Sequence, residues 1–270
     1  MPYETPETRY SALSQMLSGV QLFPRNSRPV NCICDFFAPP KPGLFCGKWT
    51  TNDVASLLAE TGCVAHWKEQ GFTGLRVECT QDFDNRYTMT VWTRFGEVDE
   101  MLCHLIVWLE YVAIERLNAS YPAFCVEHLR LQAPGKDFIH PRMPGQDFAS
   151  SGLLRRFFSI IQLWASQLGA AIITQIPQYF HTAWLFMQYF DYVDLEMHSI
   201  YRAVCEDLLP HGPSFDEAIE LSHDFENGKI RRNGEQYLWP TELQAFPLAG
   251  ELVSQISVGV KRDNAKYTKV

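Results

Sequence analysis

The sequence has 270 residues, 46% of them hydrophobic and 13% aromatic, which is long and apolar enough for a substantial buried core. Its 23 basic and 31 acidic residues leave a net charge of −8, the wrong sign for following a polyphosphate backbone, so we expect no nucleic-acid partner. The most apolar window, residues 101–117, contains charged side chains and is too short to cross a bilayer, so we expect no membrane association.

The cellular compartment follows from the N-terminus and the cysteines. The first residues, MPYETPETRY, are acidic and proline-containing where a secretory signal needs a basic start and an unbroken apolar segment. The eight cysteines are scattered and lack the Cys/His spacing of a zinc site, and Cys32 and Cys34 form the only close pair. We therefore expect a cytoplasmic protein with reduced thiols and no metal.

The first third of the chain predicts a short strand, a helix and a hairpin. A proline-rich stretch surrounds NCICDFF, which has the composition of a strand. Thr50 to Asp53 offer caps for a helix over about 54–60. LRVECT and YTMTVWTR are rich in β-formers and flank a turn-forming stretch, so they predict an antiparallel hairpin.

The middle third predicts alternating helices and strands. Apolar residues recur every three or four positions over 98–117, which indicates a helix, with a long strand as the alternative. FCVEHLRLQ has the length of a strand between two prolines. Residues 152–168 form a broadly apolar helical pattern that ends at Gly169.

Strand, helix and strand are expected again in AAIITQIP, PQYFHTAWLFMQYF and YVDLEMHSIYRAV. Further on, DEAIELSHDFENG reads as an acidic solvated helix, Asn233-Gly234 as a two-residue hairpin turn and WPTELQAF as a last helix. We see no internal repeat or linker, so we expect one domain over 1–270, with flanking additions at 1–95 and 201–270.

The stretch RMPGQDFASSGLLRRFF, residues 142–158, joins a predicted strand to a predicted helix. Gln146, Ala149 and Ser151 stand at the positions of a Q-x-x-G-x-G/A motif, with Gly152 immediately after. This stretch and AWLFMQYFDY, in which Ala183 matches a second signature, resemble the GNAT superfamily of acyl-CoA-dependent N-acetyltransferases over about residues 122–195. The resemblance implies a mixed α/β fold with a GNAT-like core at about 96–200.

It also implies that acetyl-CoA or another acyl-CoA binds as co-substrate. The pyrophosphate would lie on the N–H groups of residues 146–152, because the first turn of a helix attracts anions. Backbone N–H groups near Leu131 would polarise the thioester carbonyl, and Lys136, Arg142 and Arg156 would add cationic contacts. The expected coenzyme-binding residues are Leu131, Gln146, Asp147, Phe148, Ala149, Ser150, Ser151, Gly152 and Arg155.

The alternative interpretation of residues 142–158 is purely structural: a Pro-Gly turn followed by Ser150 or Ser151 as the N-cap of an amphipathic helix. Such a turn would need no ligand, and sequence alone leaves both interpretations open.

The resemblance implies a base on the strand before the phosphate loop and a tyrosine that protonates the departing thiolate. Glu127 is the expected base, and strand alternation places it on one face with Cys125, Leu129 and Leu131, opposite His128. Tyr189 or Tyr192 is the expected acid, and His181 is a further base or substrate contact. The alternatives are an ion pair for Glu127 and a packed, hydrogen-bonded core position for His181.

We thus expect an N-acyltransferase that acts on a small-molecule or peptide amine, with a homodimer left open. The alternative is a non-catalytic GNAT-fold binding or interaction module, which the replaced motif glycines would suit. The third hypothesis is that the resemblance is accidental and that the chain is another α/β enzyme. Both GNAT readings require the strands near 124–132 and 171–176 to be parallel neighbours.

Overall fold

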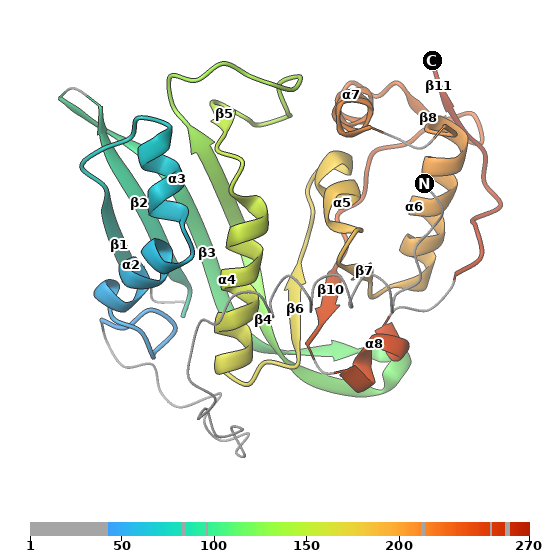
Figure 1. The fold of residues 1–270 in the computed structure, drawn as a ribbon. Helices are drawn as coiled ribbons and strands as arrows, with labels where there is room; N and C mark the ends of the chain where they lie inside the picture. The colour runs from blue at the N-terminus through green and yellow to red at the C-terminus, as the bar shows by residue number, and fades with distance from the viewer. Residues whose placement is uncertain (1–42, 83–84, 96, 212–213, 249, 257–259) are drawn as a thin grey trace. The chain divides into compact units, whose positions relative to one another are not determined.

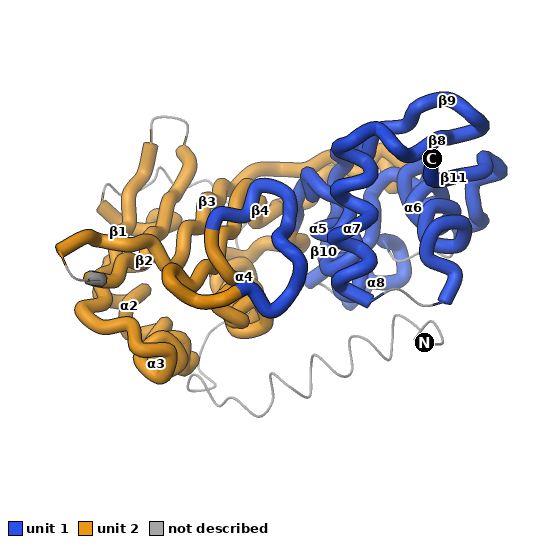
Figure 2. The backbone as a smooth tube through the Cα atoms, turned by 90° about the horizontal axis from the view of Figure 1, so that it is seen from above, with its two compact units in different colours: residues 1–14, 138–147, 174–270 blue, residues 15–137, 148–173 orange. Residues whose placement is uncertain are grey.

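The computed structural model describes residues 43–82, 85–95, 97–211, 214–248, 250–256 and 260–270. The predicted strand NCICDFF, with Cys32 and Cys34, lies outside these residues. Within them the protein is a mixed α/β structure with seven α-helices and a mostly antiparallel main sheet. The chain forms two compact units, shown in Figure 2: unit 2 includes residues 43–137 and 148–173, and unit 1 includes residues 138–147 and 174–270.

Unit 2 is built on four long antiparallel strands in the order β1-β2-β3-β4. They are β1 (Arg76–Gln81), β2 (Tyr87–Phe95), β3 (Val98–Ile114) and β4 (Ala119–Ala133). A 3-10 turn, η2 (Glu115–Leu117), and Asn118 in the left-handed region connect β3 to β4. The two-residue strand β5 (Ala149–Ser150) pairs antiparallel with the end of β4, at Gln132 and Ala133.

Three helices of unit 2 lie on one side of this sheet in Figure 1: α2 (Thr51–Glu60), α3 (Cys63–Glu69) and α4 (Leu154–Gln167). Helix α2 begins with a capping box between Thr50 and Asp53. Large side chains of the helices and of alternate strand positions are fully buried and form the core of the unit, among them Trp67, Met89, Leu105, Phe157 and Trp164.

Strand β6 (Ile172–Gln175) has its first two residues in unit 2 and its last two in unit 1. In unit 2 it is the neighbour of β4, and the Ala171 N–H donates to the Pro122 carbonyl at 2.8 Å. The arrows of β4 and β6 point the same way in Figure 1, with α4 returning between them, so the two strands are parallel neighbours.

In unit 1, β6 is followed in the sheet by β10 (Gln244–Pro247), which pairs antiparallel with β7 (Asp191–Tyr192). A separate sheet has the order β11-β8-β9, with β8 (Ile230–Arg232), β9 (Glu235–Gln236) and β11 (Tyr267–Lys269). The helices are α5 (Phe180–Phe186), α6 (Leu195–Leu208), α7 (Phe215–Glu226) and α8 (Gly250–Ile256). An aromatic-rich core joins α5, α6 and α7 through Phe180, Tyr201, Val204 and Phe225.

Most element predictions are confirmed, and three are wrong. Residues 98–114 form strand β3, because long antiparallel pairing with β2 and β4 outweighs a helical spacing of apolar residues. The predicted strand at 192–204 is mostly helix α6, whose Asp194 side chain caps the Glu196 N–H. WPTELQAF, predicted as a helix, runs irregularly into strand β10.

Candidate functional site

The predicted phosphate-binding stretch does not start its helix where the motif suggested. Helix α4 begins at Leu154, and its N-cap is Leu153, which makes no side-chain capping bond. Ser150 pairs with Gln132 in β5, and Ser151 follows β5. Neither serine is therefore the N-cap, and the capping alternative is wrong.

Several backbone N–H groups of residues 146–152 already have protein acceptors. The Gln146 N–H donates to the Met143 carbonyl at 3.0 Å, and the Ser151 N–H donates to the Leu131 carbonyl at 3.4 Å. The Gly152 N–H lies 3.4 Å from the Ser150 hydroxyl oxygen. An anion bound along this stretch would compete with these bonds.

The backbone N–H groups without an acceptor lie just beyond the motif stretch 146–152, in the first turn of α4. The first helical bond of α4 runs from the Phe157 N–H to the Leu153 carbonyl at 3.0 Å, so the N–H groups of residues 154–156 precede it. In the described part of the chain these three groups have no acceptor. Arg155 is exposed beside them, and Gly152, at a φ of +74°, leaves open space where a side chain would stand. This first turn can receive an anion.

A polar clamp from α3 holds the start of this turn. The Gln70 side-chain amide donates to the Ser151 carbonyl at 3.2 Å, and His66 Nε2 lies 2.8 Å from the same oxygen. The Ser151 hydroxyl is buried, with 1% of the residue exposed, and has no partner among the described residues. His66 and Gln70 were missed by sequence reasoning, because more than 80 residues separate them from Ser151.

Residues 138–147 belong to unit 1 and form a loop segment, called the strap, whose residues bond to one another. Arg142 Nε donates to the Gln146 carbonyl at 2.6 Å, and the Gln146 side-chain oxygen accepts from the Met143 N–H at 3.0 Å. Asp147 lies 3.8 Å from the Arg142 guanidinium. Two predicted ligands of the coenzyme, Gln146 and Arg142, are thus bonded to one another within the strap.

Two histidines attach this strap to α7. His140 Nδ1 lies 2.7 Å from Asp216 Oδ1, and His223 Nε2 lies 2.8 Å from the Arg142 carbonyl oxygen. Phe148 to Arg155, the rest of the predicted coenzyme-binding stretch, belong to unit 2.

The outer edge of β4 is only partly flanked by other strands. Strand β6 has four residues against fifteen in β4 and starts beside Pro122, so as a parallel partner it reaches roughly residue 126. Strand β5 flanks Gln132 and Ala133. Between the two lies the segment at about 127–131, which contains Glu127 and Leu131 and precedes the loop to α4.

Glu127 occupies a β-bulge, because the register with β3 shifts from Ile106↔His128 to Val107↔Val126. The extra residue breaks the alternation that was expected to place Glu127 on one face with Cys125. Its carboxylate accepts a hydrogen bond from Arg86 Nε at 2.6 Å, and its side chain is 39% exposed. The ion-pair alternative describes Glu127 correctly.

His181 is a core residue with 5% of its surface exposed. Its backbone N–H donates to the Ser222 hydroxyl at 2.7 Å, and its Nδ1 lies 3.0 Å from the same oxygen. Since the Ser222 hydroxyl donates to the Ala218 carbonyl, Nδ1 carries the proton in this contact. Burial, and then the nearby His223, lower the pKa of His181 to about 4, so the imidazole is neutral at pH 7.

Tyr189 and Tyr192, the two expected acids, differ in how far their side chains are exposed to solvent. Tyr192 is fully buried in the core of unit 1, opposite Gln244 in β10, and burial raises the pKa of its hydroxyl strongly. Tyr189 follows α5 and is half-buried, so it is the more accessible of the two.

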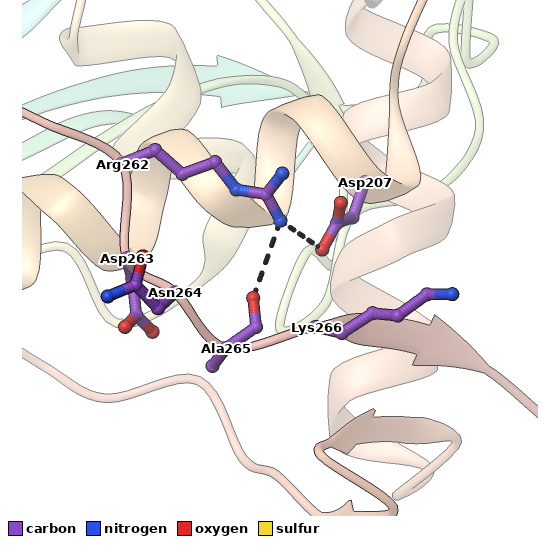
Figure 3. Close-up of a pocket in the computed structure, with 6 residues that line it drawn as sticks. All are labelled: Asp207, Arg262, Asp263, Asn264, Ala265 and Lys266. Carbon is purple, nitrogen blue, oxygen red and sulfur yellow. Dashed lines mark hydrogen bonds and ion pairs between the residues drawn. The ribbon is translucent and has the colours of Figure 1, made fainter.

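One further cavity, of about 390 Å³, lies in unit 1 and is drawn in Figure 3. Arg262 in its wall donates to Asp207 at 2.7 Å and lies 3.4 Å from the Ala265 carbonyl oxygen. Asp263, also in the wall, pairs with Arg232 outside it at 2.9 Å. Its wall is made of Asp207 and residues 262–266, and it includes none of the predicted site residues.

The described part of the chain contains no group of three or more His, Cys, Asp or Glu side chains placed to hold a metal ion. No helix within the same residues is long and apolar enough to span a membrane. Comparison of the sequence with protein-family models and with curated proteins finds no match.

Proposed function

We propose that this protein binds an acyl-CoA and transfers the acyl group to an amine, on a GNAT-like core. The parallel pair β4 and β6, joined through α4, carries the proposal. Both GNAT readings require that arrangement. The partly flanked edge of β4 and the open first turn of α4 follow one another along the chain, as carbonyl and phosphate recognition would need.

In this proposal the phosphates lie on the N–H groups of residues 154–156, with Arg155 as a cationic contact. Residues 148–152 lead into this turn, and Ser151 is held by His66 and Gln70. The thioester carbonyl lies against the edge of β4 near Leu131, where backbone N–H groups stabilise the developing oxyanion.

Attack by the amine is direct and proceeds through a tetrahedral intermediate. Glu127 remains the proposed base, either after it releases Arg86 or through a water molecule. Of the two tyrosines expected as the acid, Tyr192 is enclosed in the core of unit 1 and Tyr189 is half-buried, so the acid role of Tyr189 stays a prediction. His181 has a structural role, since both hydrogen bonds to Ser222 keep it within the α5–α7 contact.

The second candidate is a non-catalytic binding module on the same fold. It is favoured by the bonded N–H groups of Gln146 and Ser151 and by the buried Tyr192 hydroxyl. In such a module the coenzyme would bind without turnover, or the first turn of α4 would bind a phosphate of another ligand.

Titration calorimetry with coenzyme A and acetyl-CoA tests the proposal, with Arg155→Asp as the variant. Aspartate in the first turn suits the helix dipole, so α4 stays folded while its negative charge repels a phosphate. We expect micromolar binding to the wild type and a loss of about tenfold or more in the variant.

Arg94→Asp is the matched control, because Arg94 is also exposed on unit 2 but lies on β2. Its affinity is expected to equal that of the wild type. Absence of binding to the folded wild type, or equal losses in both variants, would reject the coenzyme site. Binding without thiol release across a panel of amines would favour the non-catalytic module.

A further inference from the structure

The main sheet ends in unit 2 at strand β1, whose outer edge is open. In the strand order β1 has one neighbour, β2, and Figure 1 shows β1 as the outermost strand at this end of the sheet. Among the described residues, no segment other than β2 bonds to the backbone of residues 76–81. Since every second residue of an antiparallel edge strand directs its N–H and C=O groups away from its neighbour, β1 presents a row of backbone donors and acceptors.

This edge lacks the features that usually prevent a sheet from gaining another strand. The sequence of β1, RVECTQ, contains no proline, glycine or lysine, and its register with β2 runs from residue 76 to 81 without a bulge. The two charged residues, Arg76 and Glu78, pair with each other, and Glu78 also accepts from Trp92 Nε1 at 2.8 Å. The charges of β1 are therefore compensated within the chain.

The two faces of β1 are distinct. Cys79 is the register partner of Met89, which is fully buried beneath the helices, and Cys79 itself is half-buried at the rim of that core. Glu78 and Thr80, on either side of Cys79, point to the other face of the sheet. A strand that pairs with β1 must present its two faces in the same order.

We propose that β1 pairs antiparallel with β1 of a second copy of this chain, so that the sheets of two copies join into one. A two-fold axis perpendicular to the sheet makes the two strands antiparallel and keeps the helices of both copies on the same side. Opposed residues then point to the same face, so the axis passes through a residue. The longest overlap of β1 with itself places that residue at Glu78 or at Cys79.

Charge decides between these two registers. With Glu78 on the axis, the Glu78 carboxylates of the two copies would stand directly opposite each other, which is unfavourable. With Cys79 on the axis, Glu78 faces Thr80 of the second copy. Arg76 then faces Asp82 of the second copy, which carries the opposite charge. The edge is thus self-complementary in the register centred on Cys79.

The paired segment is short, so this dimer is reversible. Backbone hydrogen bonds over residues 77–81 of each copy, with little buried area beside them, correspond to a weak interface. We expect a dissociation constant in the micromolar range. The surface lies on β1 and is independent of the coenzyme site proposed at α4.

Sedimentation velocity over a series of protein concentrations tests the proposal, with Thr80→Glu and Thr80→Lys as matched variants. Thr80 is exposed, so both variants should fold. By symmetry residue 80 faces Glu78 twice in the dimer, so glutamate adds two repulsive pairs and lysine adds two attractive pairs. We expect the dissociation constant to rise about tenfold in Thr80→Glu and not to rise in Thr80→Lys.

Two results would overturn the proposal. One is a wild type that stays monomeric up to its highest soluble concentration. The other is a dimer that both variants weaken equally or leave unchanged.

Amide hydrogen exchange of the wild type locates the interface without any substitution. Above the dissociation constant, amides of residues 77–81 should exchange more slowly than in dilute protein, whereas those of β11, an edge strand of the separate sheet in unit 1, should not change. A dimer that protects β11 or other segments but no amide of β1 would contradict the assignment.

Discussion

At the scale of single residues, His181 makes folding sensitive to acid. Burial and then His223 lower its pKa from 6.5 to about 4. Above pH 6.5 the imidazole is neutral in the folded and unfolded chains and has no effect. Between pH 6.5 and 4 the unfolded chain takes up a proton that the folded chain refuses, so the free energy of unfolding falls by up to about 3 kcal/mol.

Urea unfolding at a series of pH values checks this prediction. His181→Asn should remove this part of the acid loss, whereas His211→Asn, at an exposed position, should keep the wild-type slope. An equal slope in His181→Asn and in the wild type would contradict the burial account.

The sequence shows which residue types the candidate site contains, but not which side chains of distant segments they contact. The sequence places Glu127 on the strand before the loop, as the structure does, but its bulge and its Arg86 partner depend on pairing with other strands. His66 and Gln70 carry no local signal, because their contact with Ser151 exists only after α3 and α4 have packed.

At the scale of elements, the capping box of α7 should contribute measurably to stability. The Ser214 hydroxyl accepts from the Glu217 N–H at 3.2 Å, and the Glu217 carboxylate accepts from the Ser214 N–H at 2.8 Å. Ser214→Ala removes one half of this pair and should cost about 1 kcal/mol. Ser214→Asp retains an N-cap acceptor, so it is the matched variant.

Thermal unfolding of both variants checks the capping prediction. The alanine variant should melt several degrees below the aspartate variant. Equal melting temperatures would mean that the first turn of α7 is held by packing alone, through contacts such as those of Phe215 with His140 and Trp184.

Elements are predicted well from sequence where the local residue types alone determine the backbone conformation. The Asn233-Gly234 turn joins β8 to β9 with both residues at positive φ, as an Asn-Gly hairpin requires. Strand β3 was misread because its apolar residues suit both periodicities, and only pairing with two neighbours decides between them. The start of α4 was misplaced by about two residues, since β5 and the clamp on Ser151 fix it through tertiary contacts.

At the scale of the whole molecule, the chain leaves one compact unit and returns to it. Residues 138–147 group with unit 1, although both of their flanks belong to unit 2, and β6 is divided between the units. The expectation of a core at 96–200 with two flanks follows chain order, whereas these groupings follow contacts between distant segments. No local sequence pattern marks such excursions.

We propose that the first turn of α4 receives the phosphates of a coenzyme. The most direct measurement is the backbone amide NMR spectrum of the isotope-labelled protein during titration with coenzyme A. We expect the largest shifts on the amides of residues 154–156, with smaller shifts near Leu131. Shifts confined to other amides, or none at saturating coenzyme A, would contradict it.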